Sequence, residues 1–222
     1  MKAMILAAGR GERMRPLTDH TPKPLLQVGG KPLIVHHIEN LKKSGFSELV
    51  INHAHLGEQI VSALDNGSKW GVSIDYSAEE KALETGGGIF KALPLLTGDS
   101  FLVVNGDVWC DFDFSQLHGM IPKGDAHLVM IDNPPHNPDG DFSLNNGLLS
   151  DSKEGQRLTF SGIGVYRPEF FHHCSAGAFP LAPMLRTSMA KQRVTGSHHT
   201  GSWIDVGTPE RLAELDRKFT DQ

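Results

Sequence analysis

Short apolar runs alternate with amphipathic segments through the first half of the chain. The apolar runs have the length of buried strands and lie at residues 3–8, 48–52, 72–76 and 101–105. The segments between them carry apolar residues at helical spacing and lie at residues 31–44, 56–64 and 86–96. This order predicts an α/β fold in which a mixed, mostly parallel central sheet is covered by helices on both faces.

The second half has a less regular pattern. Strands are expected at 126–131, 157–166, 194–197 and 203–206, and short helices at 115–121, 168–172 and 181–190. A hairpin over 141–150 would turn at Asn146-Gly147. Thr208 and Pro209 are typical of the cap and first position of a final helix over 211–219. Because no linker or low-complexity tract interrupts the pattern, we expect a single domain over residues 1–222.

The composition of the chain argues against nucleic-acid and membrane partners. The net charge of −5 and the absence of a long run of one sign do not suggest a nucleic-acid-binding surface. No apolar run approaches the ~18 residues of a membrane helix, and the N-terminus lacks the features of a secretory signal. The two cysteines, Cys110 and Cys174, form no disulfide framework. We therefore expect a cytoplasmic protein with no membrane or nucleic-acid partner, as a monomer or small homo-oligomer.

The first predicted strand runs into a loop rich in glycine and arginine. Gly9 and Gly11 flank Arg10, and Arg13 and Arg15 follow. Glycines let backbone N–H groups approach an anion closely, and arginines supply fork-shaped donors. Lys23 stands between two prolines that stiffen the backbone around one cation. These residues predict a phosphate-binding site.

Three other interpretations of this loop are weaker. A dinucleotide fingerprint would need a third glycine where Met14 stands, and Pro16 would interrupt its helix. A P-loop would need Ser or Thr after Gly30-Lys31, where Pro32 follows instead. The third is a turn that binds nothing.

Two aspartates lie at the ends of predicted strands. Asp107 comes after the strand at 101–105, and Asp205 lies in the last short strand. Ligands of open α/β sheets bind beyond the carboxyl ends of the strands, and Mg²⁺ is held by one or two carboxylates plus substrate phosphates. On these grounds alone, either aspartate could equally cap the next helix or turn.

Five segments occur in the order of a known family. Residues 6–18 read L-A-A-G-R-G-E-R-M-R-P-L-T, residues 22–26 P-K-P-L-L, residues 30–32 G-K-P, residues 106–107 G-D and residues 203–209 W-I-D-V-G-T-P. This arrangement resembles the sugar-1-phosphate nucleotidyltransferases, with Glu12 and Met14 in place of the usual Thr or Ser and Leu. The resemblance implies a Rossmann-like (GT-A-like) three-layer α/β/α fold. It also implies an enzyme that joins a nucleoside triphosphate to a sugar 1-phosphate and releases pyrophosphate.

The same resemblance implies roles for individual residues. Asp107 and Asp205 would hold Mg²⁺, and Arg13 and Lys23 would be catalytic. The implied nucleotide-binding residues are Ala7, Ala8, Gly9, Gly11, Glu12, Arg13, Lys23, Glu79, Thr85 and Gly87. The implied sugar-binding residues are Asn105, Gly140, Glu154 and Gly162. Nucleotide binding would fall to residues 1–107 and sugar binding to 108–200, with the second metal motif and a helix in 201–222.

The identity of the substrates rests on weaker signals. Within the family, the run 79–88 favours UTP and N-acetylmuramate 1-phosphate, a reaction of bacterial cell-wall recycling, although Glu84 stands where the family has glycine. Mannose- or glucose-1-phosphate nucleotidyl transfer is the alternative. Phosphocholine cytidylyl transfer would need an aromatic box, for which the site offers only Trp109 and Trp203. A non-catalytic sensor of nucleotide sugars is the alternative of another class, and the intact Arg13 and Lys23 argue against it.

Overall fold

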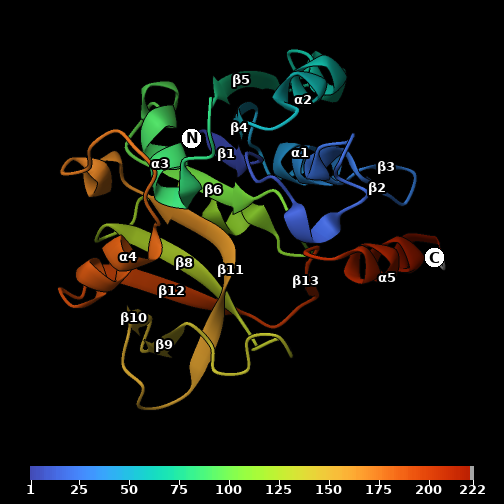
Figure 1. Ribbon diagram of the computed structural model, residues 1–222. Helices are drawn as coiled ribbons and strands as arrows, with labels where there is room; N and C mark the ends of the chain where they lie inside the picture. The colour runs from blue at the N-terminus through green and yellow to red at the C-terminus, as the bar shows by residue number, and fades with distance from the viewer. Residues whose placement is uncertain (221–222) are drawn as a thin grey trace.

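Nine strands form one mixed sheet that crosses the molecule (Figure 1). The computed structural model describes residues 1–220. In order across the sheet, the strands are β5 (Ser73–Ala78), β4 (Glu48–His53), β1 (Ala3–Leu6), β6 (Phe101–Asn105), β11 (Arg157–Tyr166), β8 (Ala126–Ile131), β12 (Val194–His199), β10 (Leu148–Ser150) and β9 (Phe142–Asn145). The mixed sheet expected from the sequence is therefore confirmed.

The parallel part of the sheet is its first half. β5, β4, β1 and β6 are parallel neighbours, as their alternation with helices requires. β11 then runs antiparallel to both β6 and β8, and β8 with β12 is the remaining parallel pair in the described sheet. The carboxyl ends of β4, β1 and β6 consequently lie side by side, where ligands of such sheets bind.

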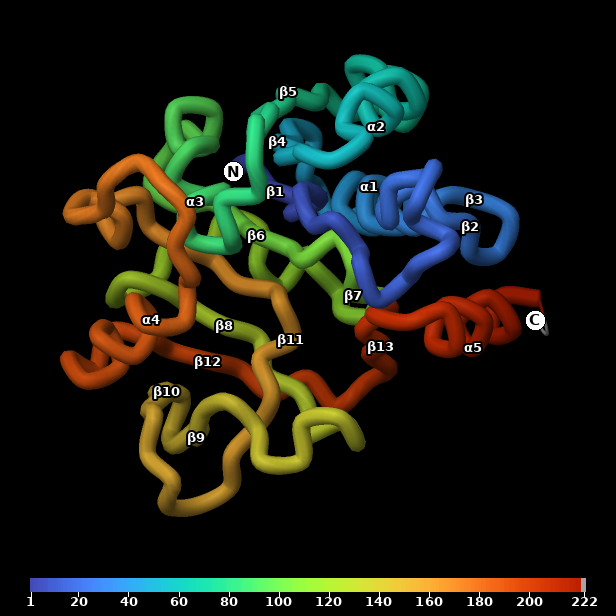
Figure 2. The backbone as a smooth tube through the Cα atoms, viewed as in Figure 1, coloured from blue at the N-terminus to red at the C-terminus, as the bar shows by residue number. Residues whose placement is uncertain are grey.

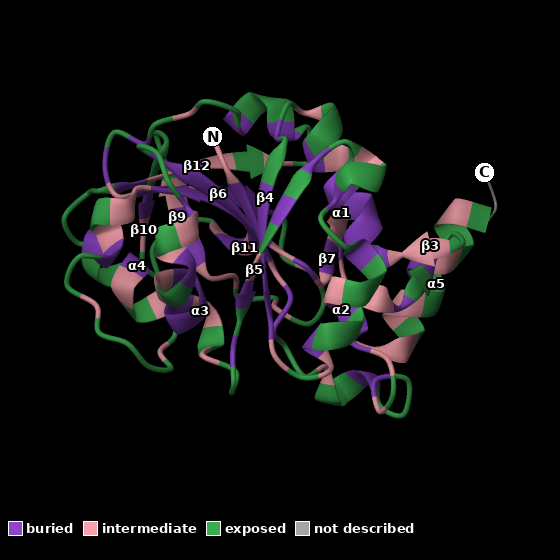
Figure 3. Ribbon diagram, turned by 90° about the horizontal axis from the view of Figure 1, so that it is seen from above, coloured by how far each residue is buried: buried purple, intermediate pink, exposed green. Residues whose placement is uncertain are grey.

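Helices cover both faces of the sheet, which gives three layers (Figure 3). α1 (Leu33–Lys43) and α2 (Gly57–Leu64) pack on one face, and α3 (Glu84–Ala92) and α4 (Ala182–Met189) on the other. The period of two in β1 shows why: Ala3 and Ile5 face the first layer, whereas Met4 faces the second. None of the helices within residues 1–220 is long and apolar enough to cross a membrane.

Two small sheets hold the end of the chain against its beginning. β2 (Gln27–Val28) pairs with β3 (Lys31–Pro32), and β7 (Val108–Cys110) pairs with β13 (Trp203–Asp205). The last helix, α5 (Pro209–Thr220), packs beside β2 (Figure 2). A small apolar cluster that includes Met14, Val28 and Leu215 joins these segments. The sequence pattern did not predict β2, β3 or β7, because each is shorter than the run needed to show a period.

Three predicted helices differ from the structure. Those at 115–121 and 168–172 are single 3₁₀ turns, Phe114–Leu117 and Pro168–Phe171. Gly119, at φ +77°, ends the first of these in a left-handed conformation. The helix predicted at 86–96 ends at Ala92 and continues as the turn Leu93–Leu95, because Pro94 has no backbone N–H to donate. The other 3₁₀ turns are Glu12–Met14, Lys23–Leu25 and Ser68–Trp70.

Candidate active site

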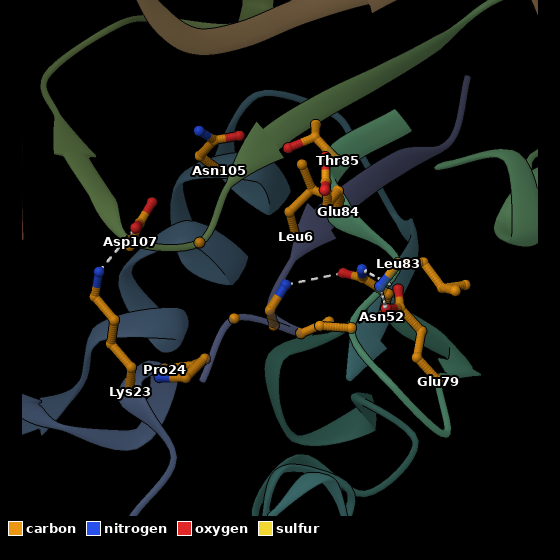
Figure 4. Close-up of a pocket in the computed structure, with 15 residues that line it drawn as sticks. Leu6, Lys23, Pro24, Asn52, Glu79, Leu83, Glu84, Thr85, Asn105 and Asp107 are labelled. Carbon is orange, nitrogen blue, oxygen red and sulfur yellow. Dashed lines mark hydrogen bonds and ion pairs between the residues drawn. The ribbon is translucent and has the colours of Figure 1, made fainter. Parts of the chain in front are cut away.

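A pocket lies at the carboxyl ends of β1, β4 and β6, beside the start of α3 (Figure 4). The residues that line it come from the opening loop, from three strand ends and from the segment before α3. They are Leu6, Ala7, Ala8, Gly9, Lys23, Pro24, Asn52, Glu79, Ala82, Leu83, Glu84, Thr85, Asn105, Gly106 and Asp107. The structure thus gathers eight of the predicted site residues around one hollow, namely Ala7, Ala8, Gly9, Lys23, Glu79, Thr85, Asn105 and Asp107.

Lys23 and Asp107 form an ion pair at one end of this pocket. Lys23 Nζ lies 2.7 Å from Asp107 Oδ2. Lys23 begins a 3₁₀ turn that follows the extended backbone of Pro22, and only 8% of the residue is exposed. Its proline neighbours fix the backbone, and Asp107 fixes the ammonium group. The cation is therefore held at one point of the pocket.

Asn52 is a pocket residue that the sequence did not single out. Its Oδ1 accepts a hydrogen bond from Ala7 N (2.8 Å), and its Nδ2 donates to Glu79 Oε1 (2.7 Å). Leu83 N donates to Glu79 Oε2 (2.9 Å), so both carboxylate oxygens of the buried Glu79 are engaged within the wall. This network ties three strand ends together, and Glu79 acts in it as a support. The sequence feature that could have identified Asn52 is a polar residue at the end of a strand that neighbours β1.

The glycines at the start of α3 make room for a loop that packs against the helix. A Cβ on Gly87 would lie 2.2 Å from the carbonyl oxygen of Gly177, and one on Gly86 would lie 2.5 Å from the Phe179 ring. Gly87 N donates to Phe179 O (3.1 Å), and Phe179 N donates to Leu83 O (3.2 Å). Gly87, predicted to bind nucleotide, therefore lies behind the pocket wall and secures it from the outside.

A second hollow adjoins the first and contains both aspartates. Its lining includes Arg13, Asn105, Asp107, His136 and Asp205. The pairing of β13 with β7 sets Asp205 opposite Val108, and Val206 N donates to Asp107 O (2.8 Å). The predicted metal ligands, far apart in sequence, are therefore neighbours in space.

The two carboxylates suit a magnesium ion that also binds phosphates. Asp205 Oδ2 accepts from Arg211 Nη1 (2.9 Å) and lies 3.6 Å from His136 Nε2. Within residues 1–220, Oδ1 of neither Asp107 nor Asp205 accepts a hydrogen bond, so each offers one oxygen to a cation. The same residues contain no group of three or more His, Cys, Asp or Glu side chains that could form a complete cage. Mg²⁺ needs no such cage, because it commonly binds one or two carboxylates plus substrate phosphates.

His37 lies behind Asp107 without adding charge to it. The side chain is buried, and its Nε2 has no hydrogen-bond partner within the described chain. Burial lowers the pKa of His37 to about 4, against the opposing effect of the Asp107 carboxylate. The ring is consequently neutral at pH 7, and Lys23 is the cation that faces Asp107.

Residues of the opening loop, which follows β1, line both hollows. Gly9 lines the first pocket, whereas Arg13 lines the hollow of the two aspartates. Gly11 lies behind the loop at φ +67°, where a Cβ would be 3.0 Å from Thr18 Cγ2. Glu12 lies outside both hollows, 3.6 Å from Arg10 in an exposed ion pair. Of the residues from Gly9 to Lys23 that were predicted to bind nucleotide, Gly9, Arg13 and Lys23 thus border the site.

The predicted sugar residues separate into two pairs. Asn105 lines both hollows, and Gly162 lies against it at φ +84°, where a Cβ would be 2.7 Å from Asn105 Cγ. A register shift in β11 between Phe160 and Ile163 places Gly162 there.

The other pair lines neither hollow. Gly140, at φ +63°, packs against Asn133, and Glu154 is exposed on the loop after β10. The structure therefore does not bring Glu154 to the site. Because Glu154 lies in an irregular loop, the sequence pattern could not predict where its side chain would lie. His136 was not predicted, although it stacks on Trp203 at 6.3 Å and faces Asp205.

Comparisons with known proteins agree with this geometry. The family model described as "Nucleotidyl transferase" matches residues 2–144. An N-acetylmuramate alpha-1-phosphate uridylyltransferase from Neisseria meningitidis serogroup B is 59% identical over 96% of this chain and 96% of its own. A protein of the same description from Caulobacter vibrioides is 32% identical over 99% of this chain and 97% of its own.

A solved structure supports the fold. It is that of a putative glucose-1-phosphate thymidylyltransferase from Bacillus anthracis in complex with a sucrose. The TM-score is 0.87 over 100% of this chain and 96% of the other, at 24% sequence identity. This likeness concerns the arrangement of the elements, and it agrees with the three-layer fold described above.

Proposed function

The chain belongs to the nucleotidyl transferase family, and from that premise we propose that it transfers a uridylyl group from UTP to N-acetylmuramate 1-phosphate. The products are UDP-N-acetylmuramate and pyrophosphate. The observation that carries the proposal is the convergence of Lys23, Asp107, Asp205 and Arg13 on two adjoining hollows. The 59% identical relative from Neisseria meningitidis supports the choice of substrates.

In this reaction an oxygen of the sugar 1-phosphate attacks the α-phosphorus of UTP, and the bond from that phosphorus to the β-phosphate bridging oxygen breaks. The residues position the reactants and offset their negative charge. Lys23, fixed by Asp107, neutralises the α-phosphate and the incoming phosphate. Gly9 leaves open space for the triphosphate at the end of β1, and Arg13 contributes a cation at the second hollow.

Asp107 and Asp205 are the residues that would hold Mg²⁺, each with a free Oδ1. When bound there, Mg²⁺ supplies positive charge to the phosphates of the reactants. Asn105 lies between the two hollows and is placed to bind the sugar or its phosphate.

The proposal is tested by pyrophosphate release. UTP, GTP, CTP, ATP and dTTP are each combined with N-acetylmuramate 1-phosphate, mannose 1-phosphate and glucose 1-phosphate, with and without Mg²⁺. We expect release to be fastest with UTP and N-acetylmuramate 1-phosphate. A clear preference for another pair would overturn the assignment of substrates, and no release with any pair would favour the non-catalytic sensor.

We also propose a setting for the reaction. N-acetylmuramate derives from bacterial peptidoglycan, so the reaction would belong to cell-wall recycling in the cytoplasm, where UTP is available. The 3-O-lactyl group distinguishes this sugar from glucose and mannose. We expect its carboxylate to lie beside the second hollow, which His136 and Trp203 line.

A further inference from the structure

A segment from the second half of the chain lies across the start of α3. Residues 172–180, which we call the strap, connect the turn Pro168–Phe171 to α4, and most of their side chains are exposed. In Figure 1 and Figure 2 this orange segment passes beside α3. Its two half-buried residues are Cys174, whose Sγ lies 3.7 Å from Met184 Sδ on α4, and Phe179. The side chain that the strap presents to α3 is that of Phe179.

Phe179 contacts the first turn of α3 with both its backbone and its ring. Phe179 N donates to Leu83 O (3.2 Å), and Phe179 O accepts from Gly87 N (3.1 Å). The ring occupies the space that Gly86 leaves open, because a Cβ on Gly86 would lie 2.5 Å from the ring atom Cδ2. One residue of the strap thus bridges the two ends of this turn.

The other side of the same turn belongs to the first pocket. Residues 82–85 line that pocket, and Leu83 N donates to Oε2 of the buried Glu79 (2.9 Å). A Cβ on Gly88 would lie 2.8 Å from Glu79 Oε1. This part of the pocket wall is therefore held between the strap and the network of Asn52 and Glu79.

The sequence of the turn gives it little tendency to keep its shape alone. Residues 86–88 are three glycines, and glycine is a weak helix former because it loses the most backbone freedom on folding. Glu84 precedes them at φ +57°, in the left-handed region where a Cβ is strained. Such a conformation persists where surrounding contacts impose it. The shape of the wall therefore depends on the contacts from the strap and from the network.

We propose that the strap positions this wall for the nucleotide, with Phe179 as the positioning residue, an inference that rests on the proposed binding of a nucleoside triphosphate in the first pocket. Phe179 does not line the pocket and acts through Leu83 and Gly87. Without its ring, a smaller fraction of molecules has the wall ready, and the apparent affinity for the nucleotide falls by that fraction. At saturating nucleotide the ligand itself holds the wall, so turnover is retained.

The first test is steady-state pyrophosphate release with UTP varied at saturating N-acetylmuramate 1-phosphate. We expect Phe179→Ala to raise KM for UTP at least about fivefold, with kcat and KM for the sugar phosphate within about twofold of wild type. Phe179→Leu, which keeps an apolar side chain beside Gly86, should recover most of the loss. A lower kcat with unchanged KM for UTP would mean a structural role only and would overturn the proposal.

Phe170→Ala is the matched control. Phe170 is also half-buried, but its ring lies 6.1 Å from that of Tyr166, and it lines neither hollow. We expect its KM for UTP to stay within about twofold of wild type, because the fraction of molecules with the wall ready does not change. An equal rise of KM in Phe170→Ala and Phe179→Ala would overturn the proposal.

Amide hydrogen exchange tests the coupling in the opposite direction. If the docked strap favours nucleotide binding, nucleotide binding favours docking of the strap by the same factor. Saturating UTP should therefore slow exchange of the Phe179 and Gly87 N–H groups, which bond across this contact. Gln116, whose N–H bonds to Asp113 O in an exposed turn outside the pocket, should exchange at an unchanged rate. Unchanged exchange at Phe179 and Gly87 would overturn the proposal.

Binding without the sugar phosphate separates this inference from the proposed reaction. Calorimetry measures the UTP affinity of wild type and Phe179→Ala in the absence of any sugar phosphate. A weaker affinity in Phe179→Ala, in a protein that releases no pyrophosphate with any sugar phosphate, would support the role of the strap and overturn the reaction. Equal affinity and equal KM in the two proteins, with pyrophosphate released, would overturn the role of the strap and leave the reaction standing.

Discussion

Lys23 Nζ donates to Asp107 Oδ2 over 2.7 Å, although 84 positions separate the two residues. The side chain of Lys23 is 10% exposed and that of Asp107 is 39% exposed, so solvent screens the contact only partly. The pair joins the opening loop to the end of β6. It sets a buried cation beside a carboxylate that keeps one oxygen for another ligand.

Removal of this cation should affect turnover more than folding of the whole chain. We expect Lys23→Ala to lower kcat at saturating UTP and sugar phosphate by at least about tenfold, because charge that develops between the phosphates loses its fixed partner. Steady-state pyrophosphate release gives the value, and Lys69→Ala, an exposed lysine over the Trp70 ring, is the control. Near-normal kcat in Lys23→Ala would contradict the assigned role.

The two aspartates should share one requirement for Mg²⁺. We expect Asp107→Asn and Asp205→Asn each to lower activity by at least about a hundredfold, and a chelator to abolish wild-type activity until Mg²⁺ is returned. Mg²⁺ titrations of activity, with isothermal calorimetry in the presence of UTP, measure both effects. Asp111→Asn serves as control, since Asp111 pairs with His199 at 2.9 Å outside the hollow. Unchanged Mg²⁺ dependence in either active-site variant would remove that aspartate from the metal site.

The sequence predicted the parts of the fold that local periodicity controls. The strand at 101–105 and the strand at 157–166 have the predicted bounds, because apolar runs and turn residues define them. Ligands of open α/β sheets bind beyond the carboxyl ends of the strands, and this generalisation correctly predicted that Asp107 lies at the pocket.

What the sequence missed depends on contacts between distant segments. The β7–β13 pair brings Asp205 to Asp107, and no local pattern in three-residue strands shows it. The network through Asn52 and the loop against Gly87 likewise require the folded chain, so the supporting role of Glu79 and Gly87 could not be separated from ligand binding beforehand.

The close approach of Gly162 to Asn105 predicts a specific effect on sugar binding. In Gly162→Ala the new Cβ would lie 2.7 Å from Asn105 Cγ and displace that side chain. We expect KM for the sugar 1-phosphate to rise at least about fivefold, the scale of a lost hydrogen bond. Gly147→Ala is the control, because Gly147 has a similar φ of +79° and open space around it. Both variants should lose about 1–2 kcal/mol of stability in urea from left-handed strain, and an equal change of KM in both would contradict the role of Asn105.

We expect His127 to account for part of the loss of folding stability in acid. It lies on β8 with Nδ1 2.9 Å from Thr195 Oγ1, and burial lowers its pKa from the ordinary 6.5. Because the unfolded chain takes up this proton first, folding loses stability as pH falls below 6.5 towards the folded-state pKa, and keeps it above 6.5. In His127→Gln, which retains polar groups but does not titrate, the free energy of unfolding should therefore change less between about pH 7.5 and about pH 5 than in wild type. Urea unfolding at the two pH values measures this difference, with the exposed His172→Gln as control. An identical pH dependence in wild type and His127→Gln would show that His127 takes up its proton equally readily in the folded and unfolded chain.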